Sequence, residues 1–272
     1  MKQYVIHIPS SKISVKNSQE VIDSAKEIGK IDVELWEGQH RDGAFRKMYE
    51  KKLRLKDRLS EWENNSYLDC IVGCFMSHFS LWEDSVRTDK RIMILEHDAI
   101  FINEYKDYYW DGIVNIGRPL WGNWFLRDKS VKNQFGNNKT HDDNSFIEDG
   151  FYKRNIDKCE KPHLGAGAAY DNDSPDHKNY CGCEKNWLVG AHSYIVSPRI
   201  AKEMIDFATE YGILPTDVFI RAEYFPMADY LPFCTYQKQD ATMIQKDLPD
   251  EQWWRLKTDA VENWKGVKDT WK

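Results

Sequence analysis

The stretch Arg91-Ile92-Met93-Ile94-Leu95-Glu96-His97-Asp98 decides the fold class of this chain. Its apolar part predicts a buried strand, and that strand ends abruptly in two carboxylates and an imidazole. In open α/β sheets, ligands bind beyond the carboxyl ends of the strands. The stretch therefore predicts an α/β fold with a functional site that begins at Glu96.

The residues before this strand predict a β-α-β unit. An apolar strand over Tyr4–Ile8 stops at Pro9, a helix begins with Ser18 as its N-cap and is closed by Gly29, and a second strand covers Ile31–Trp36. Such a unit implies a parallel sheet. Further helices are predicted over residues 44–63, 68–86 and 200–211, and further strands over 113–116 and 187–196. The last helix has Ser197 as its N-cap, followed by Pro198.

The composition is that of a globular protein. Of the 272 residues, 41% are hydrophobic and 30% are charged, and the net charge of −6 makes a nucleic-acid partner unlikely. No apolar run approaches the ~20 residues that cross a bilayer, and Met1–Ser10 lacks the apolar core of a signal peptide. Six cysteines do not suggest a disulfide scaffold. We therefore expect a cytoplasmic protein without a transmembrane segment.

Two segments differ from the rest of the predicted domain, which covers residues 1–249. Residues 118–186 are rich in Gly, Asn, Asp, Ser and Lys and show no sustained periodicity, so we interpret them as an insertion or lid with short elements of its own. Residues 250–272 predict an amphipathic helix that docks on the domain. Its Trp and Lys side chains also suit a peripheral position at a membrane, but its five basic and five acidic residues leave no net charge for anionic lipid.

The insertion carries aromatic residues and soft metal ligands. Trp121, Trp124 and Tyr170 would either stack on an acceptor sugar or pack within the insertion. The cysteines and histidines of the insertion could form a structural zinc site, although the Cys-x-Cys spacing is atypical. The alternative interpretation is that these cysteines are unpaired thiols. The residues concerned are Cys159, His163, His177, Cys181 and Cys183.

The residues that end the buried strand suit a divalent cation. Alternation along a strand places Glu96 and Asp98 on one side and His97 on the other. Carboxylate oxygens suit Mg²⁺ or Mn²⁺ that bridges the phosphates of a nucleotide, so Asp98 is the leading metal ligand. His192 could complete the metal shell from a second strand. The alternative is that the two acids only cap the next loop.

Several motifs occur in a fixed order around this strand. They are Gly73-Cys74-Phe75-Met76-Ser77-His78, the strand that ends in Glu96-His97-Asp98, Trp110–Gly117, Gly190–Ser197, Leu214-Pro215-Thr216-Asp217 and a late Gln237. In these motifs the chain resembles glycosyltransferase family 25, the lipopolysaccharide-type and collagen-type galactosyl- and glucosyltransferases. Three features depart from the family pattern, and one of them is that the acidic Gly-Glu before the Gly-Cys is not evident, Asp69 being the nearest acid. His97 stands in place of an acid of its Glu-Asp-Asp, and the segment after the first strand lacks the usual acid and arginine.

The resemblance implies a GT-A-like, Rossmann-type nucleotide-sugar fold and a hexosyltransferase. The donor would be a UDP-sugar, UDP-glucose or UDP-galactose, and the acceptor a hydroxyl of a saccharide or lipid-linked glycan, with inversion at the anomeric carbon. The alternatives are a hydroxymethylated DNA base as acceptor, or a nucleotide- or sugar-binding protein without catalysis.

The resemblance also implies roles for particular residues. Mn²⁺ or Mg²⁺ would be held by Asp98, Glu96 and His192, and Asp217 would be the base that takes the proton of the acceptor hydroxyl. The alternative for Asp217 is a helix N-cap. The expected donor contacts are Pro9, Ser10, Glu37, Ser77, His78 and Glu96.

Overall fold

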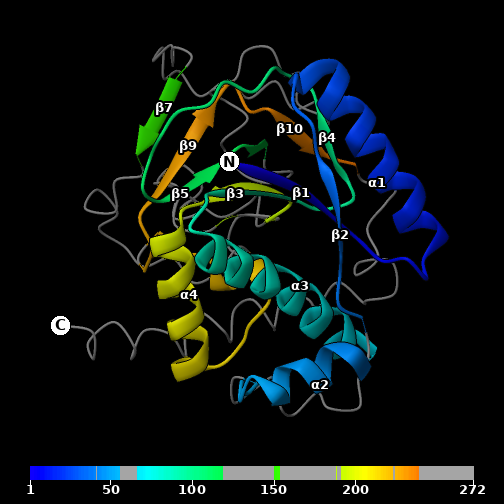
Figure 1. Ribbon diagram of the computed structural model, residues 1–272, viewed down its shortest axis with the longest axis vertical. Coiled ribbons are helices and arrows are strands. Elements are labelled where there is room, and N and C mark those ends of the chain that lie inside the picture. Colours follow the sequence, from blue (N-terminus) through cyan, green and yellow to red (C-terminus); the bar gives the residue numbers. More distant parts are fainter. Residues whose placement is uncertain are drawn as a thin grey trace, which may run out of the picture.

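The apolar strand that precedes Glu96 lies near the middle of the main sheet. A computed structural model describes residues 1–40, 42–55, 66–118, 150–153, 188, 191–222 and 224–238. In these residues seven strands form one sheet in the order β2-β1-β3-β8-β5-β9-β7 (Figure 1). They are β1 (Lys2–His7), β2 (Glu34–Glu37), β3 (Ile92–Leu95), β5 (Ile113–Asn115), β7 (Gly150–Lys153), β8 (Ser193–Val196) and β9 (Met227–Leu231).

Most strands of this sheet run in one direction. β1 is parallel to β2 and β3, and β5 is parallel to β9. β8 runs antiparallel to both β3 and β5, and β7 runs antiparallel to β9. Five of the seven strands therefore share one direction, which confirms the predicted α/β class with a mostly parallel central sheet.

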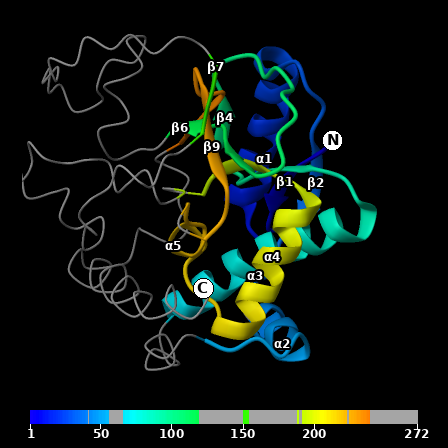
Figure 2. The ribbon, with the colours of Figure 1, turned by 90° about the vertical axis from the view of Figure 1, so that its left-hand side faces the viewer.

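β3 is buried on both faces, and this explains its unbroken apolar run. Ile92 and Ile94 belong to the hydrophobic cluster beneath α3 (Ser66–Thr88) and α4 (Pro198–Tyr211), whereas Met93 and Leu95 belong to the cluster on the side of α1 (Lys12–Ser24). Figures 1 and 2 show α3 and α4 together on one side of the sheet and α1 on the other. A strand covered on both faces needs an apolar side chain at every position.

The start of α1 corrects one predicted cap. Ser11 is the N-cap, and its hydroxyl accepts a hydrogen bond from Ser14 N at 3.2 Å, whereas Ser18 lies inside the helix and donates to Val15 O. The first turns of α1 carry exposed Ile13 and Val15 and so give no amphipathic signal. The prediction for α4 is confirmed, because Ser197 accepts from Ile200 N and a proline occupies the first turn.

The predicted helix over residues 44–63 ends early, at Glu50, and its part beyond residue 55 lies outside the described residues. α2 covers Asp42–Glu50, and Lys52 then has a φ of 57°, which does not continue a right-handed helix. Leu55 next forms a bridge with Ile213. The strand predicted over 187–196 is shorter than expected, because Ala191 has a φ of 45° and pairing starts only at β8.

Part of the predicted insertion belongs to the sheets. β7, which lies inside residues 118–186, pairs with β9 at the edge of the main sheet. A second sheet joins β4 (Ala99–Phe101), β10 (Thr235–Gln237) and β6 (Gly117–Arg118) in that order. The aromatic and zinc predictions within the insertion and the helix predicted over residues 250–272 lie outside the described residues. Within the described ranges, no helix has both the length and the hydrophobicity needed to cross a bilayer.

Candidate active site

The carboxyl ends of β1, β2 and β3 meet at one edge of the sheet. Pro9 and Ser10 form an exposed turn just after β1, and Glu37 is the exposed last residue of β2, in register with His7. Glu96 follows the last residue of β3. The sheet therefore brings three of the sequence-predicted segments to the edge where α/β proteins bind ligands.

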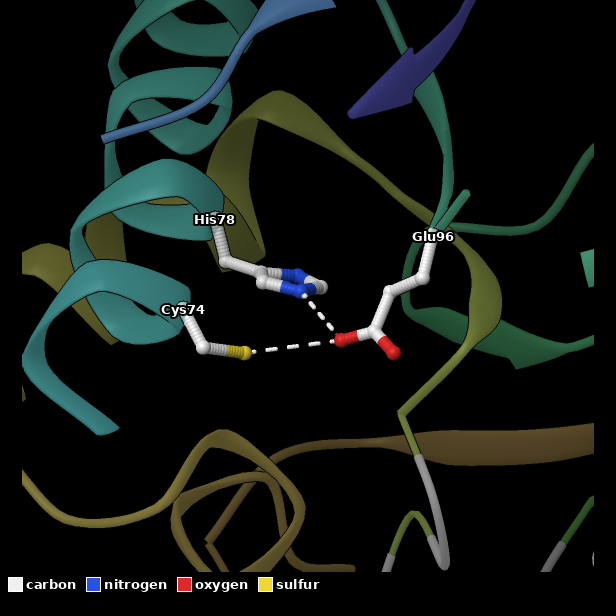
Figure 3. Close-up of side chains that lie close together, drawn as sticks. All are labelled: Cys74, His78 and Glu96. Carbon is white, nitrogen blue, oxygen red and sulfur yellow. Dashed lines mark hydrogen bonds and ion pairs between the residues drawn. The ribbon is translucent and has the colours of Figure 1, made fainter. Parts of the chain in front are cut away.

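Glu96 turns toward α3. The chain leaves the strand after Leu95 in a turn in which Ala99 N donates to Glu96 O at 3.0 Å. Glu96 Oε1 lies 3.2 Å from His78 Nε2 and 3.4 Å from Cys74 Sγ (Figure 3). Cys74 and His78 are four residues apart on α3, so they occupy the same face of the helix. Strand alternation does not extend to Glu96 and Asp98, because the turn redirects both side chains.

The ring of His78 is fixed from its other side. Tyr194 OH lies 3.0 Å from His78 Nδ1, and Trp82 Nε1 donates to the same hydroxyl at 2.8 Å. All three side chains are fully buried. Both nitrogens of His78 thus have partners within the protein, and a contact of His78 with a ligand would have to replace one of them.

Ser77, another expected donor contact, also bonds within the protein. Its hydroxyl accepts from Gln39 N at 2.8 Å and donates to Gly73 O at 2.6 Å. These bonds hold the loop after β2 against α3. The structure thus places Ser77 and His78 beside the carboxyl edge of the sheet as residues that position their neighbours.

Asp98 is a buried carboxylate with one unsatisfied oxygen. Its Oδ2 accepts from Gln237 Nε2 at 3.1 Å, and its side chain is almost fully buried. Among the residues that the structure describes, Oδ1 has no hydrogen-bond partner. Burial and the nearby charge of Glu96 raise the pKa of Asp98 to about 8. In the absence of a cation Asp98 is therefore largely neutral at pH 7.

His192 is buried next to these acids. Its carbonyl accepts from Glu96 N at 2.7 Å, and neither of its ring nitrogens has a hydrogen-bond partner in the described part of the chain. Burial lowers the pKa of His192 to about 4, although the charge of Glu96 opposes this shift. Gly117 makes room for the ring, since a Cβ there would lie 2.5 Å from His192 Nε2.

The expected metal ligands do not form the tightest cluster of potential ligands. Within the described ranges, that cluster consists of Cys74, His78 and Glu96, whose ligand atoms lie within 4.8 Å of one another. Asp98 and His192 are not part of it. The negative charge of Glu96 nevertheless shifts the pKa values of both Asp98 and His192, so the three predicted ligands lie close to one another.

Asp217 lies close to the same cluster, on α5 (Thr216–Phe219). The N-cap of this short helix is Pro215, so the alternative role of Asp217 as an N-cap is wrong. Thr216 Oγ1 lies 3.4 Å from Cys74 Sγ. Burial, the charge of Glu96 and that of Asp217 all contribute to raising the pKa of the Cys74 thiol. The half-buried Asp217 therefore lies close enough to Cys74 for its charge to act on the thiol.

Cys74 and Gln237 occur in the motifs around the buried strand, but no local pattern predicted a role for either of them. The four-residue spacing of Cys74 and His78 could have indicated a shared helix face. The bond from Gln237 to Asp98 joins residues 139 positions apart, so no local pattern could have revealed it.

Comparison with known protein families covers the region that contains most of the candidate site. A family model described as glycosyltransferase family 25 (LPS biosynthesis protein) matches residues 56–220, more than half of the chain. The matched region contains α3, Glu96, Asp98, His192 and Asp217. No curated protein matches the chain in sequence.

Proposed function

The chain belongs to glycosyltransferase family 25 and is a glycosyltransferase; from this premise we propose a metal-dependent hexosyltransferase with a GT-A-like fold. The donor is UDP-glucose or UDP-galactose, and the acceptor is a hydroxyl of a glycan or lipid-linked glycan. The observation that carries the proposal is Asp98, a buried carboxylate whose Oδ1 has no partner among the described residues and whose pKa is raised to about 8. Such a carboxylate favours a nearby cation.

Asp98 and His192 suit Mn²⁺ or Mg²⁺. Both are buried, and both present ligand atoms for which the described residues offer no hydrogen bond. An oxygen ligand together with an imidazole favours Mn²⁺ over Mg²⁺. Glu96 adds negative charge beside them. When bound, the cation neutralises the charge on the leaving diphosphate.

The donor would lie along the carboxyl edge of β1, β2 and β3. Pro9, Ser10 and Glu37 are exposed there and can contact the nucleotide sugar directly. Ser77 and His78 would act through the groups that they hold, the loop at Gln39 and the carboxylate of Glu96. The parallel direction of these three strands supports this placement.

Asp217 is the proposed base. Its carboxylate would take the proton of the acceptor hydroxyl while that oxygen attacks the anomeric carbon and the diphosphate leaves from the opposite side. A single base of this kind suits direct displacement with inversion. The half-buried position of Asp217 near Cys74 supports this role.

A panel of nucleotide sugars tests the proposal. UDP-glucose or UDP-galactose with Mn²⁺ should raise the melting temperature and give slow release of UDP, and EDTA should abolish both effects. Asp98→Asn should lose the metal-dependent shift, whereas Asp206→Asn, which changes an exposed aspartate of α4, should keep it.

Two outcomes would contradict the proposal. Mn²⁺-dependent turnover that survives in Asp98→Asn would remove Asp98 from the cation site. A thermal shift without any hydrolysis or transfer would favour a nucleotide- or sugar-binding protein without catalysis.

A further inference from the structure

We propose that Cys74, His78 and Glu96 form a zinc site, separate from the cation site proposed at Asp98. Three chemically different ligands converge there from two elements. Cys74 and His78 come from adjacent turns of α3, and Glu96 comes from the turn after β3 (Figure 3). The inference rests on this geometry and does not depend on the donor or acceptor of the transferase.

Two of the three ligand separations are close to those around a tetrahedral ion, and the third, between Cys74 and His78, lies within 4.8 Å. Zinc binds imidazole nitrogen at about 2.0 Å, carboxylate oxygen at about 2.1 Å and thiolate sulfur at about 2.3 Å. At a tetrahedral angle, these lengths place nitrogen and oxygen about 3.4 Å apart, and sulfur and oxygen about 3.6 Å apart. The observed separations are 3.2 Å between His78 Nε2 and Glu96 Oε1, and 3.4 Å between Cys74 Sγ and Glu96 Oε1. Small movements of the side chains would therefore admit the ion.

The surroundings hold the histidine in the orientation that a metal ligand needs. Nδ1 of His78 lies 3.0 Å from Tyr194 OH, which Trp82 fixes in turn, so Nε2 is directed at Glu96. Metal-bound histidines commonly use their second nitrogen in this way. On binding, the thiol proton of Cys74 passes to solvent and the ring proton of His78 resides on Nδ1, facing the tyrosine oxygen.

The site is open to solvent on one side. The side chain of Glu96 is 21% exposed and Cys74 is half-buried, whereas His78 is fully buried. An ion can therefore enter beside Glu96 and keep a fourth position for water. A thiolate among the ligands favours zinc over Mg²⁺ or Mn²⁺.

Two cysteines on one helix provide a matched test. The metal-free full-length protein is dialysed against Zn²⁺, and bound zinc is counted in the wild type, in Cys74→Ser and in Cys70→Ser. Cys70 lies one turn earlier on α3 and is not part of the cluster within the described residues. We expect Cys74→Ser to bind one zinc ion fewer per chain than the wild type, and Cys70→Ser to bind as many. Because the result is a difference, zinc bound by cysteines elsewhere cancels.

Cobalt gives a second readout of the same site. Co²⁺ bound to a thiolate absorbs in the near ultraviolet, and this band should weaken in Cys74→Ser but not in Cys70→Ser or Asp98→Asn. If Cys74→Ser loses its circular dichroism signal, Glu96→Gln takes its place and should weaken zinc binding at least about tenfold. The proposal would be overturned if Cys74→Ser and Cys70→Ser had equal zinc content and equal cobalt spectra. It would also be overturned if Glu96→Gln and the wild type did. Loss of zinc only in Asp98→Asn would assign the ion to the other site.

Discussion

Glu96 and Asp98 are two carboxylates separated by one residue, and their surroundings give them opposite electrostatics. Burial disfavours the charge on both. Glu96 is compensated by the hydrogen bond from His78, and its pKa is lowered from its ordinary value. Asp98 receives only the bond from Gln237 and also feels the charge of Glu96, so its pKa is raised. One acid therefore stays charged at neutral pH, and the other is neutral until a cation approaches.

The metal-free protein should lose stability as the pH rises from about 6.5 to about 8. The pKa of Asp98 is raised from 3.8 to about 8, so between these values the folded chain binds the extra proton. A difference of one proton lowers the free energy of unfolding by at most about 1.4 kcal/mol per pH unit. The pKa of His192 is lowered from 6.5 to about 4, which has the opposite effect below pH 6.5, where the unfolded chain binds more protons.

Melting temperatures measured against pH in the presence of a chelator test this prediction. The fall above pH 6.5 should be present in the wild type and absent in Asp98→Asn, because asparagine does not ionise. The same fall in both proteins would show that another group causes it.

At the scale of elements, α3 is the part that joins the site to the core. One face of this helix buries Phe75, Phe79 and Trp82 in the hydrophobic cluster that also contains Ile92 and Ile94 of β3. Its first turns lie close to the loop after β2, because residue 73 is a glycine whose Cβ would be 2.8 Å from Gln39 O. This close approach sets the position of the cluster that contains Glu96.

Two glycine-to-alanine substitutions should therefore change stability in opposite directions. Alanine is preferred to glycine within a helix by about 1 kcal/mol. At Gly43 of α2, a Cβ would meet nothing within 4 Å, so Gly43→Ala should raise the free energy of unfolding by up to about 1 kcal/mol. At Gly73 the close contact of the added Cβ with Gln39 O must be relieved, so Gly73→Ala should lower the free energy of unfolding by about 1–2 kcal/mol. Urea denaturation measures both, and a gain of stability in Gly73→Ala would contradict the close packing.

At the scale of the whole molecule, charge separates the two classes of acceptor. The chain carries a net charge of −6, which opposes binding to a polyanion. Proteins that bind DNA through 6–10 phosphate contacts lose ~10³–10⁵ in affinity between 50 mM and 200 mM salt. A neutral saccharide acceptor has no such dependence.

Transfer to a saccharide acceptor should therefore change by less than about threefold between 50 mM and 200 mM salt. The measurement is the initial rate of UDP release at saturating donor, with duplex DNA that contains hydroxymethylated bases as the second acceptor. Transfer to that DNA with a steep fall in added salt would make the nucleic acid the acceptor instead.

Local patterns of residues were enough to predict several elements of the fold. The apolar run of β3 predicted a buried strand, Ser197 and Pro198 predicted the start of α4, and the β-α-β unit predicted parallel strands. The order of the motifs indicated the family that the comparison then showed. The strand, the helix start and each single motif depend on neighbouring residues only. The roles of Asp217 and of the donor contacts remain predictions.

Only the tertiary structure decided which side chains meet. The turn after Leu95 sends Glu96 to α3 and Asp98 to Gln237, although alternation predicts one common side. Similarly, β7 joins the edge of the sheet from a segment without periodicity, and a positive φ at Lys52 ends the charged helix early. The physical reason is that turn conformations and contacts between distant residues depend on packing across the whole chain, which no local pattern of hydrophobicity records.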